Sequence, residues 1–447
     1  MPNHDHEHEH AAHDHHNEVT VERESPVRTR VEIVIPAEDV NVEFARQFKE
    51  LGAKVAMPGF RKGHVPRKLL EQRYGKQVAR EVTEQLAQHA FFHAVDDHKL
   101  PVVAQPVYEP IIAVKGEPLK IVARVEVKPE FEVKNLDGIT AKRETTTVTD
   151  ARVEEQVERL RKQMAQVRTV EDRPVQKGDV VRADYKGSVP DEGGDALEGK
   201  DVQLEVGAGR FLPPFEEKLL GLARGAHAID VTFPDDFDRE KLRGKAVHFD
   251  VEIKDILELV LPALDDDFAK DVDESITGVE ALRTKIREQL EVSEKDRAEA
   301  AVREQIVEQV LEKNPFEVPP SLVDRYLAAM LEDTRARLQR RGLTQADLAN
   351  LDPQRIVDEM RPQAQRAAAT QLLMETLSKQ EKIEVTDDEV EEKLQEIAKE
   401  SGSQIAKVRA YYRKEGRFET LRYQVRDDKA LAYLVGRSQI TEVTKEP

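Results

Sequence analysis

The chain contains no cysteine and no tryptophan among its 447 residues. The absence of cysteine excludes disulfide bonds, thiol nucleophiles and cysteine-ligated zinc or iron–sulfur centres. Aromatic residues make up only 5% of the chain, and no stretch approaches the roughly 18 consecutive apolar residues of a membrane-spanning helix. The first residues lack the basic, apolar and small-residue order of an export signal. We therefore expect a soluble, cytoplasmic protein with no membrane partner.

Positive charge is also scarce relative to negative charge. The 88 acidic residues outnumber the 69 Lys and Arg residues, so the net charge is −19. A protein that coats DNA or RNA with its whole surface needs a positive field, so this class is excluded, although a local basic patch is still allowed. At about 150 residues per domain, the length predicts about three domains.

Residues 1–17 hold seven of the thirteen histidines, interleaved with acids. With no apolar period, this tail is expected to be disordered. His6–His10 matches the HExxH metal motif, but that motif needs a rigid helix, so we assign no metal ligand here. The histidines of the tail could still chelate zinc or nickel loosely. An alternative function is therefore a metal store or metal carrier.

Two glycine-rich stretches resemble nucleotide-binding loops without fulfilling their chemistry. Residues 194–201 approach a Walker A loop, but Asp201 stands where a magnesium-binding hydroxyl is required. A dinucleotide-like pattern begins at Gly207, and Leu212 replaces its third glycine. We therefore expect no cofactor and no ATP-driven activity.

The apolar pattern of residues 18–130 predicts an α+β domain. Residues 31–35 alternate like a strand, and a helical run follows that we expect to end at Gly52. Further apolar spacings predict a short helix around residues 69–74 and a separate, longer one around residues 82–95.

The pattern changes twice more along the chain. Residues 131–172 read as a linker that carries one amphipathic helix after Thr149, and residues 173–260 are rich in strands and turns. Residues 261–447 read as long charged helices with narrow apolar stripes, with Asp352 as one expected N-cap and a capping box at 386–389.

One loop stands out by its chemistry. Residues 59–63 place Phe60, Arg61 and Lys62 between Gly59 and Gly63. Residues 59–80 carry seven basic side chains and one acid, a net charge of +6 within an acidic chain. A solvated basic helix face is the plain interpretation. The more specific interpretation is that the loop docks on a partner: its cations would bind phosphates or acidic groups, and its aromatic ring would stack.

The sequence Gly-Phe-Arg-Lys-Gly followed by Val65-Pro66 resembles the ribosome-binding motif of the trigger factor family, bacterial nascent-chain chaperones. The resemblance extends from about Val19 to the C-terminus. It implies that Gly59–Gly63 dock on ribosomal protein and RNA at the tunnel exit. Implied partners are the ribosome, unfolded nascent polypeptides and a second copy of the chain away from the ribosome, but not DNA. Roles in protein transport and cell division are also implied.

Residues 184–187, 209–216 and 247–251 resemble the FKBP-type peptidyl-prolyl isomerase domain. The whole resemblance implies a multidomain α+β chain, with an α+β ribosome-binding domain at 18–130, an FKBP-like antiparallel sheet wrapped on a short helix at 173–260, and an extended all-α C-terminal body with arms at 261–447. Matching by position assigns a proline pocket to seven residues: Tyr185, Leu197, Phe211, Leu212, Phe215, Phe237 and Phe249.

Three positions depart from stand-alone FKBPs. Phe215 replaces a tryptophan and Phe237 a tyrosine, which keeps the pocket apolar, and Glu198 replaces an aspartate, which bears on inhibitor affinity more than on turnover. The leading hypothesis is an ATP-independent, ribosome-associated chaperone with prolyl isomerase activity. An alternative is an isomerase whose helices are only a scaffold or a dimer interface.

Overall fold

The computed structural model describes residues 17–188, 197–209, 211–235, 237, 242–341, 353–414 and 416–445. Two predictions therefore lie outside the described residues. They are the disorder of the tail, of which only Asn17 is described, and the N-cap at Asp352. The chain divides into two compact units, residues 1–142 with 301–441 and residues 143–300 with 442–447.

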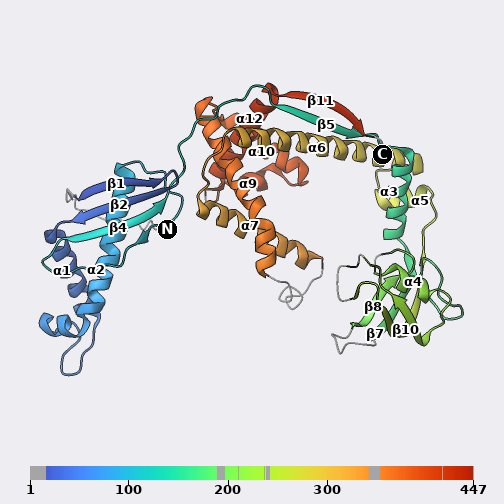
Figure 1. Ribbon diagram of the computed structural model, residues 1–447, viewed down its shortest axis with the longest axis horizontal. Helices are drawn as coiled ribbons and strands as arrows, with labels where there is room; N and C mark the ends of the chain where they lie inside the picture. Colours follow the sequence, from blue (N-terminus) through green and yellow to red (C-terminus); the bar gives the residue numbers. More distant parts are fainter. Residues whose placement is uncertain are drawn as a thin grey trace. The chain divides into compact units, whose positions relative to one another are not determined.

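The first unit begins with an antiparallel sheet covered by two helices (Figure 1). Side chains at alternate positions of the central strands, such as Ile33 and Ile121, are fully buried and pair in register, so one face of the sheet faces the helices. The strands run in the order β1-β2-β4-β3. The elements are β1 (Glu18–Ser25), β2 (Arg28–Ile35), α1 (Ala37–Lys54), α2 (Arg67–Asp97), β3 (Val107–Tyr108) and β4 (Leu119–Glu126).

Two predictions for this region were wrong. Helix α1 continues through Gly52 to Lys54, and a Cβ at Gly52 would lie 3.3 Å from Cδ1 of Leu70. The glycine therefore permits close packing of α1 against α2 rather than ending the helix. The two helices expected from residues 69 to 95 are one continuous helix, α2, which runs through Gly75 without a break.

The remainder of the first unit is helical. Its helices pack around three apolar clusters, one of which also takes Val133, Leu136 and Ile139 from the segment expected as a linker. The capping box is confirmed: Thr386 and Glu389 hydrogen-bond each other's backbone N–H groups. The helices are α6 (Val279–Lys313, continuous from the second unit), α7 (Pro320–Arg340), α9 (Pro353–Gln380), α10 (Asp387–Glu400), α11 (Ile405–Tyr412) and α12 (Arg417–Arg437).

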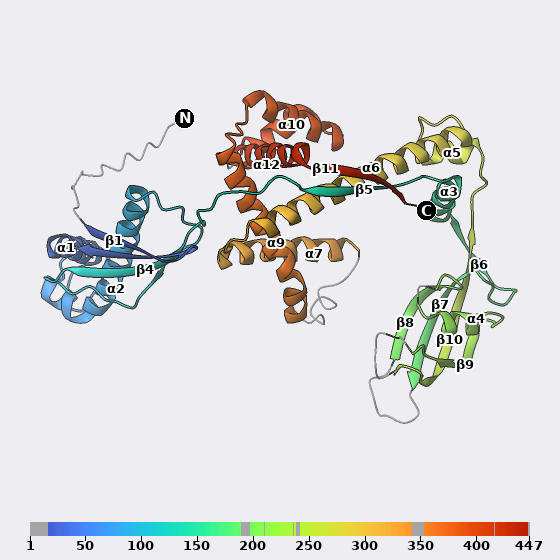
Figure 2. The same ribbon diagram turned by 45° about the horizontal axis from the view of Figure 1, so that its top comes forward.

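The second unit contains a five-stranded antiparallel sheet and a short helix (Figure 2). Hydrogen-bonded neighbours follow the order β6-β10-β7-β8, and β9 lies off this path, where it pairs with β10. The short helix that the resemblance implies is α4, which begins at Pro213. The elements are β6 (Gln166–Val170), β7 (Val180–Ser188), β8 (Leu197–Glu205), α4 (Pro213–Leu219), β9 (Gly225–Thr232) and β10 (Ala246–Val260).

The sheet of the second unit folds over α4. Alternate residues of β10, among them Phe249, Val251 and Ile253, are buried together with Phe215 and Leu219 of the helix. A second core joins α3 (Asp150–Gln163), α5 (Asp266–Val272) and the start of α6. Thr149 accepts a hydrogen bond from Arg152 N as the N-cap of α3. Strand β5 (Thr140–Thr146) pairs with β11 (Gln439–Lys445).

The chain is thus a multidomain protein that combines an α+β domain, an antiparallel sheet wrapped on a short helix, and an all-α region. Across the part of the chain that the structure describes, no helix has the length and apolar character to span a bilayer.

Candidate functional sites

Four of the seven predicted pocket residues form one aromatic cluster. The ring of Tyr185 on β7 lies 5.4 Å from that of Phe211, 5.7 Å from that of Phe215 and 6.1 Å from that of Phe249, between centroids. Phe215 also lies 5.3 Å from Phe211 and 5.1 Å from Phe249. All five contacts are edge-to-face, the arrangement that aromatic quadrupoles favour. The rings therefore make a specific apolar surface.

Exposure separates the floor of this surface from its rim. Phe215, Phe249 and Leu212 are buried, so they support the site from within the core. Phe211 keeps 39% of its surface exposed, and Tyr185 and Leu197 are half-buried. An incoming chain can touch these three residues, and Phe237, also half-buried, is a fourth that it can reach.

The remaining pocket residue, Phe237, reaches the cluster through an intermediary. Its ring lies 4.7 Å from that of Phe233, which lies 6.4 Å from that of Phe249. Phe233 is buried and was missed by the sequence reasoning. Its position just after β9 gives no local signal that distinguishes it from an ordinary core residue.

Two glycines leave space for the rings of Tyr185 and Phe249. A Cβ at Gly199 on β8 would lie 2.6 Å from Cε1 of Tyr185, and one at Gly187 on β7 would lie 2.6 Å from Cε1 of Phe249. Neither separation is tolerated by real Cβ atoms. The backbone at these positions therefore forms part of the wall on which the rings rest.

A buried carboxylate, also missed by the sequence reasoning, fixes the loop before α4. Glu216 is 2% exposed, and its Oε2 accepts hydrogen bonds from Gly207 N at 3.0 Å and Gly209 N at 2.8 Å. Its Oε1 accepts one from Phe211 N at 3.0 Å. The Phe-Glu order at the start of α4 was visible in the sequence, but the return of the loop onto Glu216 was not.

A second polar network begins at Asp184, the residue before Tyr185 on β7. Asp184 accepts one hydrogen bond from Asp201 N at 2.7 Å and forms an ion pair with Lys254 at 2.6 Å. These two contacts lower the pKa of Asp184 because they favour the charged carboxylate. Glu198, the position that departs from stand-alone FKBPs, is exposed on β8.

The loop between α1 and α2 contains two successive turns. Phe60 N donates to Met57 O at 3.0 Å, and His64 N donates to Arg61 O at 2.9 Å. Gly59 and Gly63 have φ angles of +86° and +83°, and each occupies the third position of its turn, where a type II turn requires a positive φ. Between them, Phe60 is 40% exposed, and Arg61 and Lys62 are also exposed.

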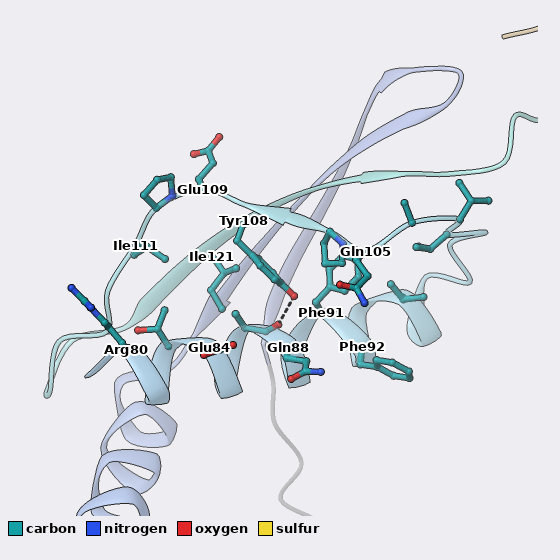
Figure 3. A pocket seen from close by; sticks show the side chains of 18 residues that line it. Arg80, Glu84, Gln88, Phe91, Phe92, Gln105, Tyr108, Glu109, Ile111 and Ile121 are labelled. Carbon is teal, nitrogen blue, oxygen red and sulfur yellow. Dashed lines mark hydrogen bonds between the residues drawn. The ribbon is translucent and has the colours of Figure 1, made fainter. Parts of the chain in front are cut away.

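An apolar cleft of about 930 Å³ lies in the same domain, between α2 and residues 102–111 (Figure 3). The hydroxyl of Tyr108 donates to Ala87 O at 3.4 Å, and Phe91 packs edge-to-face on the same ring. Phe92, at the rim, is 74% exposed. The cleft therefore offers apolar surface to another molecule.

The helical region carries a cleft of mixed character. A hollow of about 780 Å³ is lined by Met374 and Leu431 together with Asp427 and Arg366. Burial raises the pKa of Asp427, and Arg426 only partly opposes it. No group of three or more His, Asp or Glu side chains within the described ranges could hold a metal ion.

The chain matches known proteins over almost its whole length. The model of the bacterial trigger factor protein matches residues 17–160, that of the FKBP-type peptidyl-prolyl cis-trans isomerase residues 171–254, and that of the trigger factor C-terminus residues 278–436. Trigger factors from a Geobacter species and from Geotalea daltonii are both 36% identical, over 96% of this chain and 99% of theirs. That of an Anaeromyxobacter species is 39% identical over 94% of this chain and 99% of its own. The chain therefore belongs to the trigger factor family, ribosome-associated chaperones that carry a prolyl isomerase domain of the FKBP type.

Proposed function

We propose that the aromatic cluster around Tyr185 binds the proline of an X–Pro bond in a client chain. Phe215, Phe249 and Leu212 form the floor, while Phe211, Leu197, Phe237 and Tyr185 contact the substrate. The observation that carries this proposal is the set of edge-to-face contacts among Tyr185, Phe211, Phe215 and Phe249, which leaves Phe211 exposed.

The isomerisation follows from the polarity of this site. Rotation about the peptide bond has a barrier of about 18–20 kcal/mol because resonance makes the amide planar and charge-separated. The twisted amide carries less charge separation, so an apolar pocket favours it relative to the planar form. Floor rings exclude water from the rotating bond, and the hydroxyl of Tyr185 donates to a substrate carbonyl. The step needs shape and polarity rather than a nucleophile.

Isomerase turnover tests this assignment. The variant Phe237→Ala should lower kcat/KM for an X–Pro peptide in a protease-coupled assay, whereas Phe92→Ala, outside the second unit, should leave it unchanged. Equal activity of the Phe237 variant and the unaltered chain would contradict the pocket assignment.

We further propose that the loop Gly59–Gly63 docks on the ribosome at the tunnel exit. Arg61 and Lys62 supply charge for RNA phosphates or acidic side chains, and Phe60 supplies a ring that stacks or wedges. The two turns support this role because they hold all three side chains outward on a short, defined loop. The surrounding basic stretch explains how a chain with a net charge of −19 could approach an RNA-rich particle.

Co-sedimentation with empty and translating ribosomes tests the docking loop. Replacing Phe60, Arg61 and Lys62 by Ala should weaken binding and reduce the salt slope by about 2, one for each lost cation. A matched control, Arg28→Ala with Lys49→Ala, removes the same charge from exposed positions of this domain. Unchanged, salt-insensitive binding of the loop variant would overturn the assignment.

We propose that unfolded polypeptides contact the cleft beside α2 and the mixed cleft of the helical region. Both offer apolar groups next to charge, a combination that binds many sequences weakly. The alternative, in which the helices are only a scaffold, predicts that Phe211→Ala and Phe237→Ala abolish client protection together with turnover. Aggregation suppression that survives in an isomerase-inactive variant would exclude it.

Other expectations stay predictions. A cytoplasmic location, roles in protein transport and cell division, and a homodimer away from the ribosome fit the family; sedimentation velocity tests the dimer. Metal storage by residues 1–17 would require tight nickel or zinc binding that disappears when the tail is deleted.

A further inference from the structure

Two histidines lie side by side on the outer face of α2. His89 and His93 are four residues apart, so they share one face of the helix, and both are exposed. Their Nε2 atoms lie 3.4 Å apart, with ring centroids separated by 4.5 Å. The helix beneath them is anchored by Ala90, Phe91 and Ala94, which are all buried in the core of the domain. The pair is therefore presented on a rigid support.

The separation of the two nitrogens matches that of a chelating pair. Zinc binds imidazole nitrogen at about 2.0–2.1 Å, so two such ligands at a tetrahedral angle lie about 3.3–3.4 Å apart. Histidines four residues apart on one helix are also the spacing that helical zinc motifs use. A single N–H···N hydrogen bond between the rings explains the same distance. The two explanations differ in whether the pair binds an added metal ion.

One ionisable pair on α1, Glu43 with Arg46, lies near the two histidines. The carboxylate of Glu43 on α1 lies within electrostatic range of His89. Burial raises the pKa of Glu43, but hydrogen bonds from Arg46 and Gln47 outweigh this effect. Glu43 therefore stays ionised, and because its charge is balanced by Arg46 at 2.6 Å, the case for the site rests on the geometry of the two imidazoles.

We infer that His89 and His93 form a two-histidine site for a divalent transition metal, with zinc as the tested ion. Within the described residues no third His, Asp or Glu completes the group, so water fills the other positions. Structural zinc sites have four protein ligands, and this one is accordingly open and exchangeable. Neutral imidazole suits zinc, copper and nickel but not magnesium, which prefers oxygen ligands.

The test uses the full chain with the seven histidines of residues 1–17 replaced by serine, because the tail would otherwise bind zinc as well. Isothermal titration with zinc chloride should show one ion bound per chain. His89→Gln and His93→Gln should each lose that ion, whereas His98→Gln, also exposed and just after the same helix, should retain it. Magnesium chloride should bind to none of these proteins at this pair.

Far-UV circular dichroism is the control that each variant keeps the helical content of the parent. Two results would overturn the inference. One is zinc binding that is equal in the parent and in the His89 and His93 variants, which would place the ion elsewhere. The other is a parent that binds no zinc, which would leave the two histidines as a hydrogen-bonded pair only.

Discussion

The carboxylate of Glu216 accepts a hydrogen bond from the backbone N–H of Phe211 at 3.0 Å. This contact joins a fully buried charge in the first turn of α4 to the most exposed ring of the proposed pocket. Because the other oxygen holds Gly207 and Gly209, one side chain fixes the whole loop that carries Phe211. Glu216 is therefore a positioning residue rather than a group that contacts substrate.

Glu216→Ala should lower both turnover and stability. Each buried N–H left without a partner costs about 1–3 kcal/mol. We expect kcat/KM for an X–Pro peptide to fall by at least about tenfold, since misplacement of a positioning group by 1 Å can cost on the order of 10²-fold. Glu216→Gln, which keeps one acceptor oxygen, should recover part of the activity. The control is Glu217→Ala, exposed on the same turn; similar losses in both Ala variants would argue against the loop-fixing role.

Substitutions of Phe211 and Phe249 by Ala should affect turnover and stability to different extents. Phe249→Ala removes a buried ring and should cost about 3–5 kcal/mol in unfolding free energy. Phe211→Ala removes a ring that is 39% exposed, so we expect only about 1 kcal/mol but a clear fall in kcat/KM. Urea unfolding and the protease-coupled assay measure the two effects. If both variants lost activity only in proportion to stability, Phe211 would be an ordinary core residue.

Local signals allowed part of this fold to be predicted. The reciprocal bonds of Thr386 and Glu389 involve residues three apart, and Pro213 begins a helix by its own fixed φ, so both could be recognised without tertiary information. The interpretation of Gly52 failed because its reason is the distant side chain of Leu70. A glycine that ends a helix and one that admits a neighbouring helix look alike in a sequence.

The proposed pocket shows the same division. Its aromatic residues could be assigned by position, and the structure brings Tyr185, Phe211, Phe215 and Phe249 together. Glu216 and Phe233 were missed because their partners approach only when the chain folds back. Similarly, the segment around Val133 reads as a linker because its apolar residues are few. Those residues pack against helices more than 150 positions away.

Gly199→Ala should displace the ring of Tyr185, which rests against the backbone at this position. The added Cβ would lie 2.6 Å from the ring of Tyr185 and 2.8 Å from Cγ2 of Val202, so the ring must move. Overpacking of this kind costs about 1–3 kcal/mol, and we expect a fall in kcat/KM along with it. Lys200→Ala, at the exposed neighbouring position, is the matched control. Full activity of the Gly199 variant would indicate that the orientation of Tyr185 does not matter for turnover.

Asp179 should make the stability of the second unit depend on acid pH. Arg173 binds its carboxylate through two bonds of 2.6 and 2.8 Å, and Gln176 N donates at 2.8 Å. Burial raises the pKa of Asp179, but these bonds outweigh it and hold the pKa below its usual value. A carboxyl whose folded pKa is lowered stabilises the fold above its unfolded pKa, near 3.9, and loses this contribution as the pH falls through the folded pKa.

Asp179→Asn should therefore destabilise the sheet by about 2 kcal/mol at neutral pH, because it weakens hydrogen bonds to a charged, buried carboxylate. The difference from the unaltered chain should shrink as the pH falls below the unfolded pKa and through the lower folded pKa, where the original carboxyl also becomes protonated. Urea unfolding with amide hydrogen exchange of β7 and β10 measures this difference at each pH. The exposed Asp172→Asn should show neither effect, and a difference for Asp179→Asn that stays constant with pH would mean that the ionised carboxylate does not stabilise the sheet.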